Sequence, residues 1–156
     1  MGVLVAGCLV LALSGCGHGD PDPGGRILTA LRSIESAVPT GATDVRTQDA
    51  EPLWDSCDGR PGTEGWSVIS VDIEFRDDRD GRVLLDDVAD RMTEAGWAPG
   101  GTGTSPLGPS ESWTRTLDDG TVAHGSLSPG TRDDGVSIIW FLTATAPPHG
   151  RQASGC

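Results

Sequence analysis

The 156-residue sequence contains no lysine, no asparagine and no tyrosine. Its 11 basic residues are therefore all arginines, and they stand against 23 acidic residues, which gives a net charge of −12. With so few basic groups there is no basic stripe that could neutralise the phosphates of a nucleic acid. The same negative charge opposes docking onto anionic lipid headgroups. We therefore expect no nucleic-acid partner, and solubility is the simplest explanation of the excess of acidic residues.

The sequence also has no apolar run long enough to cross a bilayer as a helix, which takes about 20 residues. Its longest early run, Val3 to Leu13, is interrupted only by Gly7 and Cys8. This length is typical of the apolar region of a secretory signal peptide. The alternative is a buried core helix, but the run has no polar face and so makes a poor amphipathic helix.

The apolar run ends in the tetrapeptide Leu13-Ser14-Gly15-Cys16. It resembles the lipobox of bacterial lipoproteins, in which Leu, then Ser or Ala, then Gly or Ala precede a cysteine. The resemblance implies that residues 1–15 are a signal peptide, that Cys16 receives a diacylglyceryl group, and that Cys16 becomes the first residue after cleavage. The implied location is the extracytoplasmic face of the cell membrane, where the lipid is the anchor.

Two features depart from this pattern. The first residues carry no Arg or Lys, although a signal peptide normally begins with basic residues, so either the true start lies upstream or the signal is atypical. A second stretch, Val5-Ala6-Gly7-Cys8, fits the lipobox loosely but follows only a few apolar residues. Cys16 is therefore the preferred lipidation site.

The stretch after the lipobox reads GHGDPDPGG, from Gly17 to Gly25, and contains no apolar residue. Glycine and proline at this density are typical of a flexible tether. We therefore expect residues 16–25 to be the lipidated cysteine and a tether. Residues 26–156 then have the length of a single domain.

Only two of the four cysteines remain once the signal peptide and the lipidation site are set aside, namely Cys57 and Cys156. In an oxidising compartment such a pair usually closes as a disulfide. The loop of about 100 residues would nominally stabilise the fold by about 4.7 kcal/mol. The alternatives are two free thiols or a metal site with His124 or His149. The sequence has no CxxC or HxxxH spacing that would support the metal site.

Apolar residues at 3–4 spacing predict two helices. The first covers 26–38 and ends at Pro39. The second covers about 82–95, with Asp80 as its N-cap and Gly96 at the position after its C-terminus.

Alternation of apolar and polar residues predicts strands over 69–76, 112–117, 121–127 and 136–144, the last being central because it is apolar on both faces. Asp119-Gly120 predicts a hairpin turn between the second and third of these. Residues 98–109 are expected to be a loop, and the region before 65 to be mostly irregular, with a short strand near Val45. The element order predicts an α+β two-layer sandwich, with an antiparallel sheet of about four strands and two helices packed on one face.

This layout, with an ending that reads ATAPPHGRQASGC, is similar to that of small uncharacterised lipoproteins of high-GC Gram-positive bacteria. The resemblance implies no catalytic residue.

The segment 76–87, RDDRDGRVLLDD, resembles an EF-hand calcium loop in the spacing of Asp78 and Asp80. However, Arg76 stands where the first ligand belongs, and Asp87 replaces the bidentate glutamate. A polar turn capped by Asp80 is the preferred interpretation. We expect no metal and no cofactor.

Signatures of nucleophilic catalysis are missing: there is no G-x-S-x-G, no S-x-x-K and no H-E-x-x-H. His124 lies near Ser126, but strand alternation places both side chains toward solvent. Of the five tryptophans, Trp54 and Trp113 are the candidates for exposed ligand-binding residues that could stack on sugars or peptides.

The sequence therefore predicts a non-enzymatic, membrane-anchored extracytoplasmic module that binds another envelope component, either a protein or a cell-wall glycan. The alternative is a small envelope hydrolase that uses acidic residues.

Overall fold

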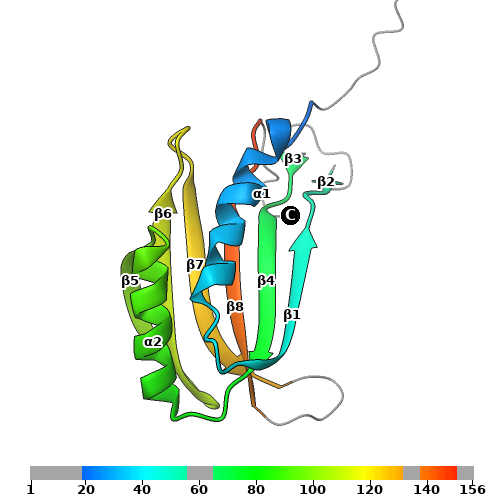
Figure 1. The fold of residues 1–156 in the computed structure, drawn as a ribbon. Coiled ribbons are helices and arrows are strands. Elements are labelled where there is room, and N and C mark those ends of the chain that lie inside the picture. Colours follow the sequence, from blue (N-terminus) through cyan, green and yellow to red (C-terminus); the bar gives the residue numbers. More distant parts are fainter. Residues whose placement is uncertain (1–18, 56–64, 132–137, 151–156) are drawn as a thin grey trace, which may run out of the picture.

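The computed structural model describes residues 19–55, 65–131 and 138–150. The predicted signal peptide, the lipobox with Cys16, and the predicted Cys57–Cys156 pair lie outside the described residues. Within them the chain forms one six-stranded antiparallel sheet with helices packed against it (Figure 1).

The elements follow one another along the chain as η1 (Pro23–Gly25), α1 (Arg26–Leu31), η2 (Arg32–Ala37), β1 (Thr43–Ala50), β2 (Trp54–Asp55), β3 (Gly65–Trp66), β4 (Ile69–Arg76), α2 (Gly81–Glu94), β5 (Ala98–Ser105), β6 (Gly108–Thr116), β7 (Val122–Gly130) and β8 (Ile139–Ala146), where η denotes a 3-10 helix. The strand order in the main sheet is β1-β4-β8-β7-β6-β5, and every neighbouring pair is antiparallel. β2 and β3 pair with each other in a separate two-stranded sheet.

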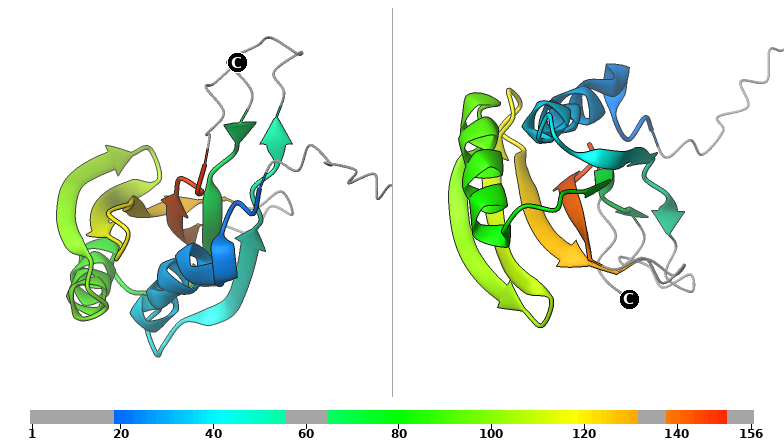
Figure 2. Two further views of the ribbon diagram at one scale, coloured as in Figure 1. Left: turned by 90° about the horizontal axis from the view of Figure 1, so that it is seen from above. Right: turned by 60° about the horizontal axis from the view of Figure 1, so that its bottom comes forward.

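Both α-helices lie on the same face of the sheet, as Figures 1 and 2 show from several directions. The α+β class and the antiparallel sheet are confirmed. The expected number of about four strands is wrong, because β1 and β5 complete a sheet of six. These two are the edge strands, and most of their side chains are exposed, so neither carries the apolar alternation that reveals a strand in a sequence. Residues 98–105, expected in a loop, form β5.

The predicted first helix is present but divides into α1 and the 3-10 helix η2. The predicted second helix is confirmed as α2, with its N-terminus capped by Asp80, whose Oδ1 accepts a 2.9 Å hydrogen bond from the backbone N–H of Arg82. At the other end of α2, Gly96 has φ +86°, and the backbone N–H of Trp97 donates to the carbonyl of Met92 at 2.9 Å. The predicted C-terminal glycine of α2 is therefore confirmed, with Gly96 in the left-handed conformation.

The core fills the space between the sheet and the helices. The inward side chains of β4 are the alternating Ile69, Val71, Ile73 and Phe75, all of which are buried. β8 lies between β4 and β7, so its predicted central position is confirmed.

The two ends of the sandwich carry different elements (Figure 1). At the end we call the N-terminal end, the first described residues meet the β6–β7 turn and residues 147–150, and the backbone N–H of His149 donates to the carbonyl of Pro21 at 2.8 Å. At the opposite end, which we call the distal end, the β4–α2 connection meets the β5–β6 turn and the start of β8. The first and the last described residues therefore both lie at the N-terminal end.

Candidate functional site

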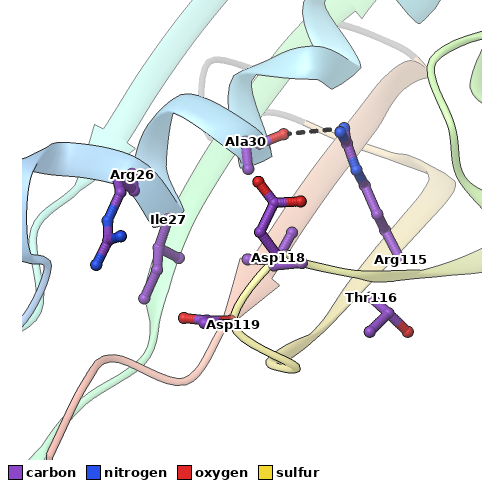
Figure 3. A pocket seen from close by; sticks show the side chains of 8 residues that line it. Arg26, Ile27, Ala30, Arg115, Thr116, Asp118 and Asp119 are labelled. Atoms are coloured by element: carbon purple, nitrogen blue, oxygen red, sulfur yellow. Dashed lines mark hydrogen bonds between the residues drawn. The ribbon is translucent and has the colours of Figure 1, made fainter.

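A small pocket of about 130 Å³ opens at the N-terminal end. We call it the Arg115 pocket; its walls are Arg26, Ile27 and Ala30 of α1 and residues 115–119 of β6 and the following turn. Figure 3 shows these side chains around the hollow. The walls come from segments about 90 positions apart in the sequence, and the packing of α1 against the end of β6 brings them together.

Arg115 is held firmly in the wall of this pocket. Its Nη1 donates to the hydroxyl of Ser33 at 2.7 Å, to the carbonyl of Ala95 at 3.2 Å, and to the carbonyl of Ala30 at 3.4 Å. The Ala30 contact is the dashed line in Figure 3. One guanidinium nitrogen thus joins β6 to α1, to η2 and to the end of α2.

The rest of the Arg115 guanidinium is unused within the described part of the chain. Neither Nε nor Nη2 donates a hydrogen bond there, and no carboxylate among those residues forms an ion pair with it. Asp118, which lines the same pocket, likewise has no hydrogen bond or ion pair with a described residue. The pocket therefore presents an unpaired cation and an unpaired anion.

Asp119, by contrast, is fully engaged. Its Oδ1 accepts from the backbone N–H of Thr121 at 2.8 Å, and its Oδ2 lies 3.0 Å from Nε2 of His149. The Thr121 backbone N–H and hydroxyl, with a smaller effect of His149, hold the pKa of Asp119 below its usual value. Asp119 closes the turn with Gly120, whose φ is +84°, so the predicted hairpin at Asp119-Gly120 is confirmed.

A larger groove of about 350 Å³ lies at the distal end. Leu107 and Ile138 line it and are 41% and 48% exposed, whereas Trp140, beneath them, is only 4% exposed. Gly81 sits against this ring, and a Cβ there would lie 3.3 Å from it, so a larger residue would press on the groove floor. We call this hollow the distal groove.

Residues 76–79 form the polar rim of the distal groove. Arg79 donates from Nη2 to Asp77 at 2.7 Å and from Nη1 to Asp87 at 2.9 Å, and Arg91 adds a 2.7 Å contact to Asp87. Arg79 holds the pKa of Asp77 below its usual value, and Arg91 and Arg79 do the same for Asp87.

Three carboxylates of the EF-hand-like segment thus serve as a helix cap or as ion-pair partners. Asp80 caps α2, while Asp77 and Asp87 bind arginine. Among the residues that the structure describes, no group of three or more His, Cys, Asp or Glu side chains could hold a metal ion.

The sheet face opposite the helices carries mostly small hydroxyl side chains. In it Asp72 accepts hydrogen bonds from the hydroxyl of Thr143 at 2.8 Å and of Ser70 at 3.1 Å. His124 and Ser126 are exposed on the same face, as predicted. These residues lie on the three neighbouring strands β4, β8 and β7, and neither hollow opens onto them.

The expected exposure of Trp113 is wrong. Its side chain is 1% exposed because β6 turns it toward the helices, and its Nε1 has no hydrogen-bond partner in the described residues. Trp54 is partly exposed and packs edge-on against Trp66, with ring centroids 5.2 Å apart at 78°. Trp54 lines neither hollow.

The remaining predicted site residues, Leu13, Ser14, Gly15 and Cys16 with the Cys57–Cys156 pair, lie outside the described residues. Neither α1 nor α2, the α-helices of the described ranges, has the length and apolar composition needed to cross a bilayer. Comparisons with protein-family models, with curated proteins and with solved structures give no match for this chain.

Proposed function

We propose that the protein is a non-enzymatic, lipid-anchored module on the extracytoplasmic face of the cell membrane, which binds another component of the envelope through its distal groove. The lipobox-like Leu13-Ser14-Gly15-Cys16 supports the anchor. The observation that carries the binding role is the position of the groove. It lies at the end of the sandwich opposite the point where the chain enters (Figure 1). An anchor at Cys16 would therefore leave the groove facing away from the membrane.

The chemistry of the groove favours a protein partner over a cell-wall glycan. Sugars stack on the flat faces of exposed aromatic rings, but Trp140 is almost fully buried. The exposed apolar side chains of the groove are Leu107 and Ile138, which lose unfavourable contact with water when another protein covers them. The volume of the distal groove, about 350 Å³, falls within the range of about 300–1,000 Å³ that is usual for binding pockets. We infer that a partner inserts an apolar side chain here.

The anchor is tested by Cys16→Ala. Diacylglycerol supplies two acyl chains, which is enough for stable anchoring at about 0.8 kcal/mol per buried CH₂. The variant should leave the membrane fraction or remain as an uncleaved precursor, whereas the control Cys57→Ser should stay anchored. A processed Cys16→Ala protein that still sediments with membranes would contradict the lipoprotein assignment.

The groove is tested by crosslinking in the native envelope, followed by identification of the captured protein. Leu107→Asp and Ile138→Asp should each abolish capture, because a carboxylate in an apolar contact must lose its hydration. Val122→Asp is the matched control, since Val122 is 43% exposed but is the first residue of β7, next to the β6–β7 turn at the N-terminal end. Equal capture by all three variants would place the partner elsewhere.

The rival function, a small envelope hydrolase, has one specific observation in its favour. The Asp119–His149 contact of 3.0 Å borders the Arg115 pocket, and an aspartate that orients a histidine is a common arrangement in hydrolases. Under this alternative, Asp119→Asn would abolish a hydrolytic activity of the purified protein and leave capture through the groove intact. The binding module requires no such activity.

A further inference from the structure

We propose that the Arg115 pocket binds the α-amino acid group of a small ligand, with the ligand carboxylate on Arg115 and the ligand ammonium on Asp118. This site goes beyond the proposed function, since it lies at the opposite end of the body from the distal groove. It depends neither on the lipid anchor nor on the partner of the groove.

The charges around the Arg115 pocket differ from those of the chain as a whole. The chain has 23 acidic residues for 11 arginines, yet Arg115 forms no ion pair with any described residue although it is partly buried. The pocket walls carry two arginines and two aspartates, so their formal charges cancel, whereas the chain as a whole is strongly negative. A simple anion would be repelled by the surrounding charge, whereas a zwitterion would not.

The Arg115 guanidinium is held in a geometry that suits a carboxylate. Because Nη1 of Arg115 is held by Ser33, Ala30 and Ala95, the guanidinium is fixed before any ligand arrives. Its unused Nε and Nη2 form the edge that binds a carboxylate through two parallel hydrogen bonds. In the view of Figure 3 the Asp118 carboxylate lies on the Arg115 side of the hollow, with Arg26 on the other side.

The size and the lining of the Arg115 pocket suit a small ligand. A volume of about 130 Å³ is well below that of a pocket for a drug-sized molecule, about 300 Å³ or more, and so admits only a few heavy atoms. Ile27, Ala30 and Leu117 provide an apolar wall. The pocket thus matches an amino acid with a short apolar side chain, such as alanine.

The test titrates the purified full-length protein with alanine, followed by amide chemical shifts and by calorimetry. Saturable shifts should be confined to residues near 26–30 and 115–119. Acetate and ethylamine, which carry one charge each, should bind at least about tenfold more weakly, because each leaves one charged pocket group without its hydrogen bond. Equal binding of acetate would make this an anion site and overturn the proposal, as would the lack of saturable binding of alanine.

Asp118→Asn is the decisive variant, because Asp118 is exposed and makes no described contact that holds the fold. It should weaken alanine binding about tenfold or more. Asp90→Asn, also exposed but on α2, is the matched control and should bind as the wild type does. Arg115→Lys keeps the charge but loses the two-pronged edge and should also weaken binding. Unchanged binding in Asp118→Asn would refute the assignment.

Discussion

The indole Nε1 of Trp97 donates a 3.0 Å hydrogen bond to the hydroxyl of Ser33, a residue 64 positions earlier in the chain. The same hydroxyl oxygen accepts a 2.7 Å bond from Arg115 and donates a 2.7 Å bond to the carbonyl of Ala30. One serine thus saturates its donor and acceptor groups where η2, the end of α2 and β6 meet. A buried indole N–H without such a partner would be costly.

Ser33→Ala should therefore destabilise the fold by about 1–3 kcal/mol, since it leaves the Trp97 indole without its described acceptor and removes the shortest of the three hydrogen bonds from Nη1 of Arg115. Urea unfolding followed by tryptophan fluorescence measures the change. Ser36→Ala is the matched control: Ser36 lies in the same 3-10 helix, is exposed, and bonds only the carbonyl of Ser33. Equal effects of the two substitutions would show that the Ser33 network is not stabilising.

Asp22→Ala should cost about 1 kcal/mol, although Asp22 lies in the segment predicted to be a tether. Its two carboxylate oxygens accept hydrogen bonds from the backbone N–H groups of Ile27 and Leu28, each at 2.9 Å, and so close the first turn of α1. Thermal unfolding of the variant measures the loss. The control Asp78→Ala, in an exposed loop, should be nearly neutral; a similar loss there would indicate a general charge effect.

The parts of the fold that the sequence predicts are those that bury one face. Apolar and polar residues alternate along β4 because the side chains of Ile69, Val71, Ile73 and Phe75 are all buried in the core. Both ends of α2 are recognisable in the sequence, the first by the N-cap Asp80 and the second by Gly96. β5 carries no such signal. Its sequence is APGGTGTS, and it lies at the edge of the sheet. Backbone hydrogen bonds to β6 hold it there, and such pairing requires no pattern of apolar residues in the sequence.

The two hollows could not be predicted from the sequence, for a different reason. Arg26 and Arg115 belong to one pocket only because α1 packs across the end of β6, and no local pattern encodes a contact between segments so far apart. The same holds for Leu107 and Ile138 in the distal groove. For Trp113 a signal was present, since it shares a strand face with the apolar Leu117, and that alternation correctly indicates burial.

Trp113→Ala should accordingly destabilise the protein by about 3–5 kcal/mol, the usual cost of emptying a buried aromatic site. Trp54→Ala should cost less, because Trp54 is partly exposed; its edge-on contact with Trp66 is worth about 0.5–1.5 kcal/mol beyond burial. Chemical denaturation of both variants compares them directly. If Trp113→Ala were as stable as the wild type, Trp113 would have to be a surface residue.

The ion pair of Asp77 with Arg79 should make stability depend on pH below about 4. The side chain of Asp77 is only 3% exposed, and the guanidinium of Arg79 holds its pKa below the usual value. The unfolded chain therefore binds the proton more readily than the native protein does. The stabilisation is fully present above the unfolded pKa of about 4 and is lost as the pH falls through the lower native value.

Asp77→Asn should consequently be less stable than the wild type at pH 7, and the difference should shrink as the pH falls below about 4 through the lowered native pKa of Asp77. Urea midpoints at successive pH values measure this convergence. Asp78→Asn is the matched control, because Asp78 is the exposed neighbour and forms no ion pair with a described residue. Its difference from the wild type should stay small throughout. A gap between Asp77→Asn and the wild type that did not shrink at all as the pH falls below about 4 would mean that Asp77 acts through packing, or through the hydrogen bond that it accepts from the Arg79 backbone N–H, rather than through charge.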